Sequence, residues 1–145
     1  MIEPEQRDFP SFEDALRVKW NTLHSTKRRG PKLPPVFVYW SILLEFHALH
    51  ERFPSVQDTD EVMTLATRMC EEHEISKDLL DETRLNNLAS VATVDMTPIC
   101  AIMGGMIGQE VVKAISQKDE PICNFFFYDA LQGNGRMRRI GNIPP

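Results

Sequence analysis

The sequence predicts an α/β chain that is mostly helical and ends in an aromatic β-hairpin. Apolar residues recur at helical spacing in several stretches between residues 11 and 115. An aromatic segment at residues 124–129 follows, and a turn separates it from a second short strand at 136–140. With 145 residues, the chain can form a domain with a real core. Its net charge of −5 argues against a general binder of nucleic acid or anionic membranes.

The N-terminal third contains two helical candidates and a connector. Ser11 and Asp14 form a capping-box-like start, so we expect a short helix through about Lys19. Residues 21–35 hold Ser, Thr, Lys, Arg, Gly and three prolines, which predicts an exposed connector. Residues 36–49 are apolar on most sides, which predicts a helix buried over much of its circumference.

Two amphipathic helices are expected next. Within residues 58–73 one apolar stripe comprises Val62, Leu65, Ala66, Met69 and His73. The charges lie opposite this stripe, which predicts a surface helix packed along one side. A further helix is expected from a cap at Asp81 to about Ala92. Its inward residues are expected to be Leu85, Leu88, Ala89 and Ala92.

The segment at residues 97–115 is expected to be the helix around which the chain is organised. Thr97 can cap it, and Pro98 suits the first helical position. One side carries only small residues: Ala101, Gly104, Gly105 and Gly108. Each interior glycine lowers helix stability by about 1 kcal/mol relative to Ala, which close packing of another backbone must offset. We therefore predict a buried helix whose small residues, with Phe125 and Phe127 of the aromatic strand, form a packing or partner interface.

A membrane span is the rival interpretation, because G-x-x-x-G in an apolar segment is a dimerisation pattern in lipid. Polar groups return at Gln109, Glu110 and Lys113. The apolar run that ends before Gln109 is therefore shorter than the roughly 20 apolar residues that a span needs, so the sequence predicts no membrane partner.

The C-terminal part is expected to be a hairpin. Residues 124–129 are aromatic without alternation, which predicts a strand covered on both faces. Residues 131–135 are expected to turn the chain, and residues 136–140 to return as the second strand.

The sequence predicts no catalytic, cofactor-binding or metal-binding residues of its own. Gly133 and Gly135 follow a strand, but a dinucleotide-binding fingerprint would need a third glycine at position 138, and this residue is Arg. The Gly104-Gly105 pair lies inside a helix, away from the free N–H groups that bind phosphate.

The histidine and cysteine patterns bear on metal and thiol chemistry. His47, His50, Cys70 and His73 could in principle surround zinc, yet packing against apolar stripes is the favoured interpretation. Three cysteines without paired spacing suit a reducing compartment. Cys70 and Cys100 are expected to be structural, and Cys123 to be a small buried hydrophobe.

One long motif carries a family resemblance. It comprises Pro98, the Gly104-Gly105 pair, Gln109-Glu110-Val-Val-Lys113-Ala and an aromatic strand ending in Tyr128-Asp129-Ala130. These residues resemble the non-catalytic half of ubiquitin-like-protein activating enzymes. The turn at 133–135, the early end of the chain and the opening at 8–20 are similar to the small subunit of the SUMO branch.

The resemblance implies the C-terminal part of a Rossmann-like adenylation fold of the ThiF/MoeB type. Residues 1–145 would form one portion of that domain, with a helical segment at about 11–92 and a core helix and hairpin at about 97–141. The N-terminal nucleotide-fold half would be absent, so a fragment, a short isoform or an incomplete gene model is expected.

The resemblance also implies a role in a ligase-type heterodimer that activates SUMO for protein sumoylation. ATP, Mg²⁺ and the thioester-forming cysteine would belong to the large catalytic subunit, and SUMO would be contacted indirectly. The expected location is the nucleus, with the cytoplasm second. Two alternatives stay open: the regulatory half of a ubiquitin- or NEDD8-activating enzyme, and a stand-alone helical interaction module. Apolar surface left uncovered is expected to cause dye binding and self-association.

Overall fold

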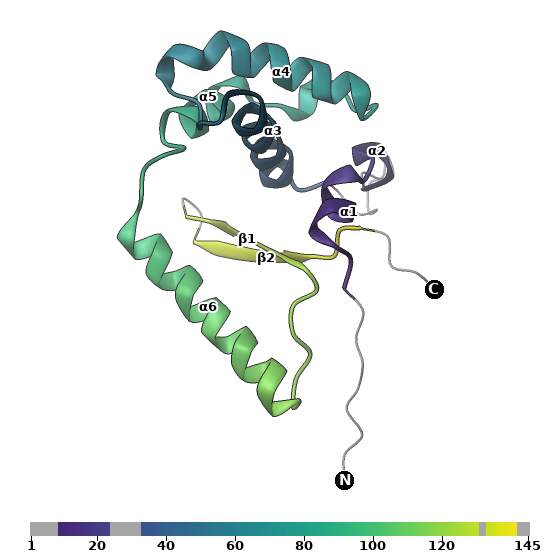
Figure 1. Cartoon of the computed structure of the whole chain (residues 1–145), viewed down its shortest axis with the longest axis vertical. Coiled ribbons are helices and arrows are strands. Elements are labelled where there is room, and N and C mark those ends of the chain that lie inside the picture. Colours follow the sequence, from purple (N-terminus) through teal and green to yellow (C-terminus); the bar gives the residue numbers. More distant parts are fainter. Residues whose placement is uncertain (1–8, 24–32, 131–132, 142–145) are drawn as a thin grey trace. The chain divides into compact units, whose positions relative to one another are not determined.

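The computed structural model describes residues 9–23, 33–130 and 133–141. The chain divides into two compact units, one of residues 19–95 and one of residues 1–18 with 96–145. The described residues are mostly helical and contain a single antiparallel β-hairpin (Figure 1). This confirms the helical α/β class with its C-terminal hairpin.

The unit at residues 19–95 is a cluster of helices. It contains α2 (Trp20–Leu23), α3 (Pro35–His50), α4 (Thr59–Glu72) and α5 (Glu82–Ser90), with 3₁₀ turns η1 (Val56–Asp58) and η2 (Lys77–Leu79). The helices α3, α4 and α5 each pack against the other two. The predicted long helices are therefore confirmed. The connector prediction is wrong at 21–23, which are helical, and residues 24–32 lie outside the described part.

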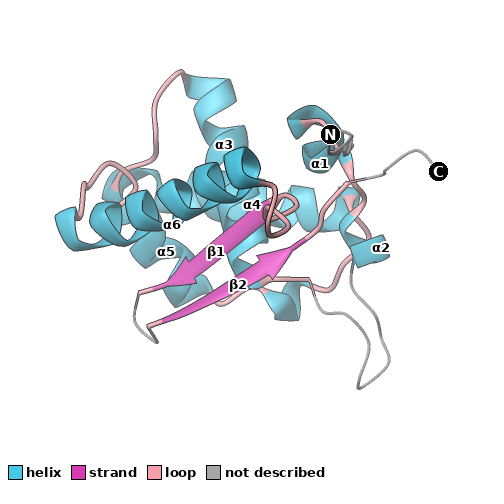
Figure 2. Cartoon of the chain, turned by 90° about the horizontal axis from the view of Figure 1, so that it is seen from below, coloured by secondary structure: helices cyan, strands magenta, loops and turns pink. Residues whose placement is uncertain are grey.

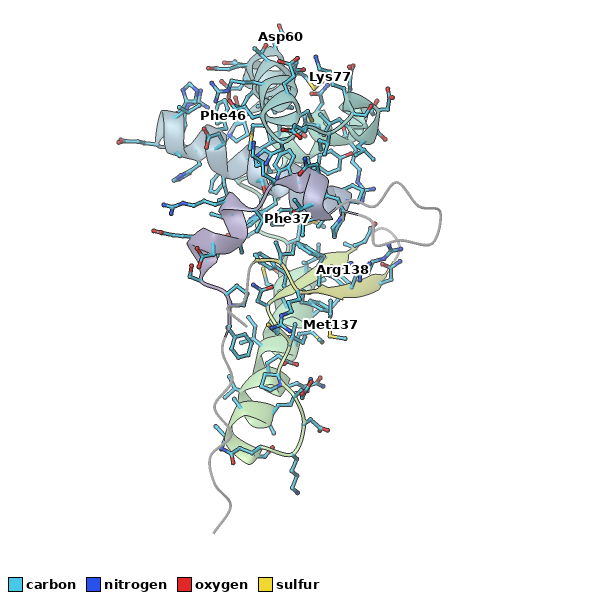
Figure 3. The ribbon with its side chains drawn as sticks, turned by 90° about the vertical axis from the view of Figure 1, so that its right-hand side faces the viewer. Phe37, Phe46, Asp60, Lys77, Met137 and Arg138 are labelled. Atoms are coloured by element: carbon cyan, nitrogen blue, oxygen red, sulfur yellow. The ribbon has the colours of Figure 1, made fainter. Side chains whose placement is uncertain are left out.

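The core of this unit comes mainly from α3. Its buried side chains are Phe37, Val38, Tyr39, Ser41, Ile42 and Phe46. Phe37 and Phe46 are labelled on this helix in Figure 3. The stripe predicted on α4 is confirmed at Val62, Leu65, Ala66 and Met69, which are buried together with Cys70, whereas His73 at its end is half-buried. On α5, Leu85 and Ala89 are buried, whereas Leu88 and Ala92 are only half-buried.

Polar contacts fix the ends of these helices. Asp81 caps α5 as predicted, because its Oδ1 accepts a hydrogen bond from the Arg84 N–H at 3.1 Å. The Asp81 N–H donates to Tyr39 Oη at 3.0 Å, which joins α3 to the start of α5. The rings of Trp20 and His73 stack with centroids 4.1 Å apart, so α2 lies against the end of α4.

An ion pair holds the connection between α3 and α4. The Arg52 guanidinium donates two hydrogen bonds to the Asp58 carboxylate, at 2.8 and 2.7 Å. The Ser55 N–H donates to the same carboxylate at 2.7 Å. Arg52, followed by Ser55, holds the pKa of Asp58 well below its usual range. The carboxylate therefore stays charged and fixes the turn.

The other unit contains α1 (Phe12–Arg17), α6 (Thr97–Ser116), β1 (Phe125–Asp129) and β2 (Asn134–Arg138). Ser11 caps α1 as predicted, since its Oγ accepts from the Asp14 N–H at 3.0 Å. The N-cap of α6 is Met96, so Thr97 is the first helical residue rather than the cap.

The hairpin pairs β1 with β2 in antiparallel orientation (Figure 2). Phe125 lies opposite Arg138, and Phe127 lies opposite Arg136. The second strand begins at Asn134, two residues earlier than predicted. Gly135 can join it because the Phe126 ring occupies the space that any Cβ would need. All five residues of β1 are half-buried, so the prediction of full cover on both faces is wrong. Turn residues 131–132 lie outside the described part.

An amide side chain closes the base of the hairpin. Asn124 Nδ2 donates to the Ile140 carbonyl at 2.8 Å, and the Ile140 N–H donates to Asn124 Oδ1 at 3.0 Å. These paired bonds extend the strand pairing beyond Arg138 through a side chain.

Candidate functional site

The helix α6 has no buried residue along its length from Thr97 to Ser116. Its half-buried positions share one side and comprise Ile99, Met103, Met106, Glu110 and Lys113. The prediction of a buried core helix is therefore wrong for this chain. The physical reason is that the described residues cover α6 along one line only, and the rest of its apolar surface faces solvent.

The covered side of α6 borders an apolar groove of about 360 Å³. Its lining comes from α6, from the segment that leads into β1 and from β1 itself: Met103, Met106, Ile107, Glu110, Val111, Ala114, Ile122, Asn124 and Phe126. Sequence reasoning missed this groove. The available signal was a pair of methionines at i, i+3 ahead of an aromatic strand, since flexible Met side chains suit irregular apolar surfaces.

The predicted small residues lie on the side of α6 opposite its half-buried positions, given 3.6 residues per turn. A Cβ at Gly104, Gly105 or Gly108 would meet no atom within 4 Å. The prediction that these glycines pack against the aromatic strand is therefore wrong. We call this side of the helix the small face, and it comprises Ala101, Gly104, Gly105, Gly108, Val112 and Ile115.

The small face ends in two of the more exposed apolar side chains of the described chain. Val112 is 63% exposed and Ile115 is 78% exposed. Both lie in line with the glycines at helical spacing. Together they form a shallow apolar surface on which another backbone could approach closely, which is how small residues act between helices.

The predicted residues Phe125 and Phe127 lie elsewhere in the unit. Their rings stack with centroids 5.7 Å apart on one side of the hairpin. The intervening Phe126 points to the other side and lines the groove beside α6. The structure therefore brings Phe125 and Phe127 together but does not bring them to the small face.

Glu110 fastens the segment after α6 back onto the helix. Its carboxylate accepts from the Ile122 N–H at 2.6 Å and from Lys113 Nζ at 2.7 Å. The Lys113 hydrogen bond, followed by the Ile122 N–H, lowers the pKa of Glu110. Sequence reasoning used Glu110 and Lys113 for the family resemblance and against a membrane span, but did not predict their contact. Their i, i+3 spacing was the available signal for an ion pair.

The histidines pack against rings, as the packing interpretation predicted. His47 lies 4.7 Å from Phe53 and His50 lies 4.3 Å from Phe46, measured between ring centroids. Among the residues that the structure describes, no group of three or more His, Cys, Asp or Glu side chains could hold a metal ion.

The three cysteines differ in exposure. Cys70 is buried as predicted, and burial raises the pKa of its thiol. Cys123 is half-buried. Cys100 was expected to be structural, yet it is exposed, because α6 itself is uncovered.

The helix α6 is also the described helix that is long and apolar enough to cross a membrane. The length argument against a span is therefore wrong, because the helix has 20 residues. One such helix is weak evidence for a span. The Glu110–Lys113 ion pair would be expensive in hydrocarbon.

Several known proteins are similar to this sequence over most of its length, although no family model matches it. It is 35% identical over 131 residues to SUMO-activating enzyme subunit 1 of Danio rerio, covering 88% of this chain and 36% of that protein. For subunit 1A of Arabidopsis thaliana the identity is 33% over 142 residues, covering 98% and 42%. For subunit 1B-1 of Arabidopsis thaliana it is 38% over 130 residues, covering 88% and 38%.

These similarities confirm the resemblance to the small subunit of SUMO-activating enzymes. The chain spans about two fifths of the length of the curated relatives it matches.

Proposed function

Taking the similarity to SUMO-activating enzyme subunit 1 as the premise, we propose that this chain is the non-catalytic subunit of a heterodimeric, ATP-dependent SUMO-activating enzyme. It acts through contact with the large catalytic subunit and supports adenylation and thioester transfer of SUMO there. The observation that carries the proposal is the uncovered small face of α6, in a sequence that matches these subunits over 88–98% of its length.

The energetics of α6 support a partner on this face. Each of its interior glycines lowers helix stability by about 1 kcal/mol relative to Ala. Within the described chain no close approach at Gly104, Gly105 or Gly108 offsets that loss. A helix or strand of the large subunit packed on the small face would offset it and would cover Val112 and Ile115.

The proposal assigns the chemistry to the large subunit. ATP and Mg²⁺ bind there, and so does the activated carboxyl terminus of SUMO, while this chain contributes structure to a ligase-type complex. The absence of a phosphate-cradle motif from the sequence supports this division. The chain then forms the C-terminal portion of a Rossmann-like adenylation domain and works in the nucleus, with the cytoplasm second.

Co-elution and activity together test the proposal. We expect the full chain to co-elute with a SUMO-activating large subunit, and to show no SUMO-dependent ATP–pyrophosphate exchange when alone. Exchange by the isolated chain would contradict the assignment of chemistry to the partner.

Mixing the chain with other large subunits and with lipid vesicles distinguishes the alternative functions. Preference for the large subunit of a NEDD8-activating enzyme would favour the other regulatory-half assignment. A chain that binds neither large subunit, stays monomeric and does not bind a hydrophobic dye would favour a stand-alone module. Flotation of the chain with lipid vesicles would favour the membrane interpretation of α6.

A further inference from the structure

We propose that the outer edge of β2 is a docking site for an acidic, extended segment of a partner protein, which β2 takes up as a third strand. The proposal goes beyond the function proposed above, because it uses the free edge of the hairpin and leaves α6 aside.

The first observation is an unpaired strand edge. In the described part of the chain the sheet has two strands, so β2 (Asn134–Arg138) has a strand along one edge only. Gly135 and residues 136–139 are all exposed. Unpaired N–H and C=O groups along such an edge are a template for an added strand.

The second observation is the charge along this edge. Arg136, Arg138 and Arg139 fall within four consecutive positions of a chain whose net charge is −5. Among the described residues they form no ion pair, and the Arg138 guanidinium donates to its neighbour's carbonyl at Met137. Like charges oppose the pairing of two copies through this edge, whereas an acidic strand is attracted.

The register sets the sequence pattern of the ligand. Arg136 and Arg138 lie on the side of the hairpin that carries Phe127 and Phe125, because they are directly opposite them. Met137, labelled with Arg138 in Figure 3, lies on the other side and is 59% exposed. Side chains of an added strand would lie about 4.5–5.5 Å from these residues, measured between Cβ atoms. The fitting ligand therefore alternates acidic residues, beside the arginines, with apolar residues beside Met137.

Fluorescence anisotropy of the full chain with a labelled peptide, Glu-Val-Glu-Val-Glu, tests this directly. We expect saturable binding that is about tenfold weaker in Arg136→Glu/Arg138→Glu. Arg17→Glu/Lys118→Glu makes the same charge change at exposed sites outside β2 and is expected to leave binding unchanged. Glu-Pro-Glu-Pro-Glu has the same charge but cannot complete a strand ladder, so it is expected to bind about tenfold more weakly.

A charge swap keeps the test decisive if the first variant alters folding. Arg136→Glu/Arg138→Glu is expected to bind Lys-Val-Lys-Val-Lys, which the parent chain rejects. The proposal would be overturned by no binding of the acidic peptide, by equal binding of the proline peptide, or by equal weakening in the control variant. Oligothymidine binding in place of the peptide would also overturn it. The assay contains no other subunit, so its outcome is separate from that of the proposed function.

Discussion

The helices α3 and α6 are both apolar, and only one of them is covered. Each has a proline in its first turn and ends on a left-handed residue, Glu51 with φ 56° and Gln117 with φ 53°. Of the 16 residues of α3, six are buried, whereas none of the 20 residues of α6 is. Apolar composition thus indicates that a helix needs cover. It does not indicate whether the same chain or another chain supplies that cover.

The side chains of the two helices match this difference. The helix α3 carries large side chains, such as Phe37, Ile42 and Phe46, that fill the space beside α4 and α5. The helix α6 carries glycines, which fill nothing and instead allow a close backbone approach. In our account α3 stabilises the chain, and α6 is kept for a partner.

The largest expected effect is at Phe46, which is fully buried. Phe46→Ala is expected to lower the free energy of unfolding by about 3–5 kcal/mol, because it leaves a cavity. Ile115→Ala on α6, where the side chain is 78% exposed, is the matched control and should change it by less than about 0.5 kcal/mol. Urea denaturation of both variants measures the contrast. Equal losses would mean that α6 is packed as tightly as α3.

A glycine of the small face is expected to give an effect of opposite sign. Gly105→Ala should raise the free energy of unfolding of the isolated chain by about 1 kcal/mol, because a Cβ there meets no atom within 4 Å. Gly135→Ala is the control and should lower it, because the Phe126 ring fills that space. Thermal denaturation compares them. A lower melting temperature for Gly105→Ala would show that the small face is packed within the chain.

The packed helical unit is also expected to respond to pH through His73. Burial lowers the pKa of His73, and the positive charge of Lys19 adds to the shift. Unfolded histidine titrates at about pH 6.5, so protonation of His73 costs no stability above that value. The free energy of unfolding decreases as the pH falls from about 6.5 through the folded pKa, because the unfolded chain binds the proton more readily. His73→Phe keeps a ring against Trp20 and should flatten this part of the melting temperature profile, whereas an unchanged profile would exclude His73 as its source.

The smallest expected effect is local and lies next to α6. Glu110→Gln should weaken the hydrogen bond from the Ile122 N–H, because a carboxylate is a stronger acceptor than an amide. Hydrogen exchange at Ile122 should then be faster, with little change in global stability. Glu110 has a lowered pKa, so its contribution is complete above about 4.3, the value of an unfolded Glu, and is lost as the pH falls through the folded pKa. Unchanged exchange in the variant at neutral pH would contradict this role.

Sequence patterns identified most elements, because their signals are local. The α4 stripe from Val62 to Met69, the caps at Ser11 and Asp81 and the aromatic strand all follow from neighbours in sequence. The burial of α6 did not follow, because the exposure of Gly105 or Cys100 depends on which segments surround the helix. The start of β2 was also missed, because glycine at position 135 is typical of a turn. The need for glycine in this strand depends on the Phe126 ring beside it, which the local sequence does not indicate.

Calorimetric titration of the SUMO-activating large subunit with the chain and with Gly105→Leu tests the central claim most directly. Overpacking a close contact opposes binding by about 1–3 kcal/mol, so the variant should bind about tenfold or more weakly than the parent chain. Lys118→Leu, which adds an apolar side chain after the end of α6, should bind as the parent does. We predict one-to-one binding that Gly105→Leu weakens while the isolated variant stays folded. Equal binding by the parent chain and Gly105→Leu, or no binding by the parent chain, would contradict a partner on the small face.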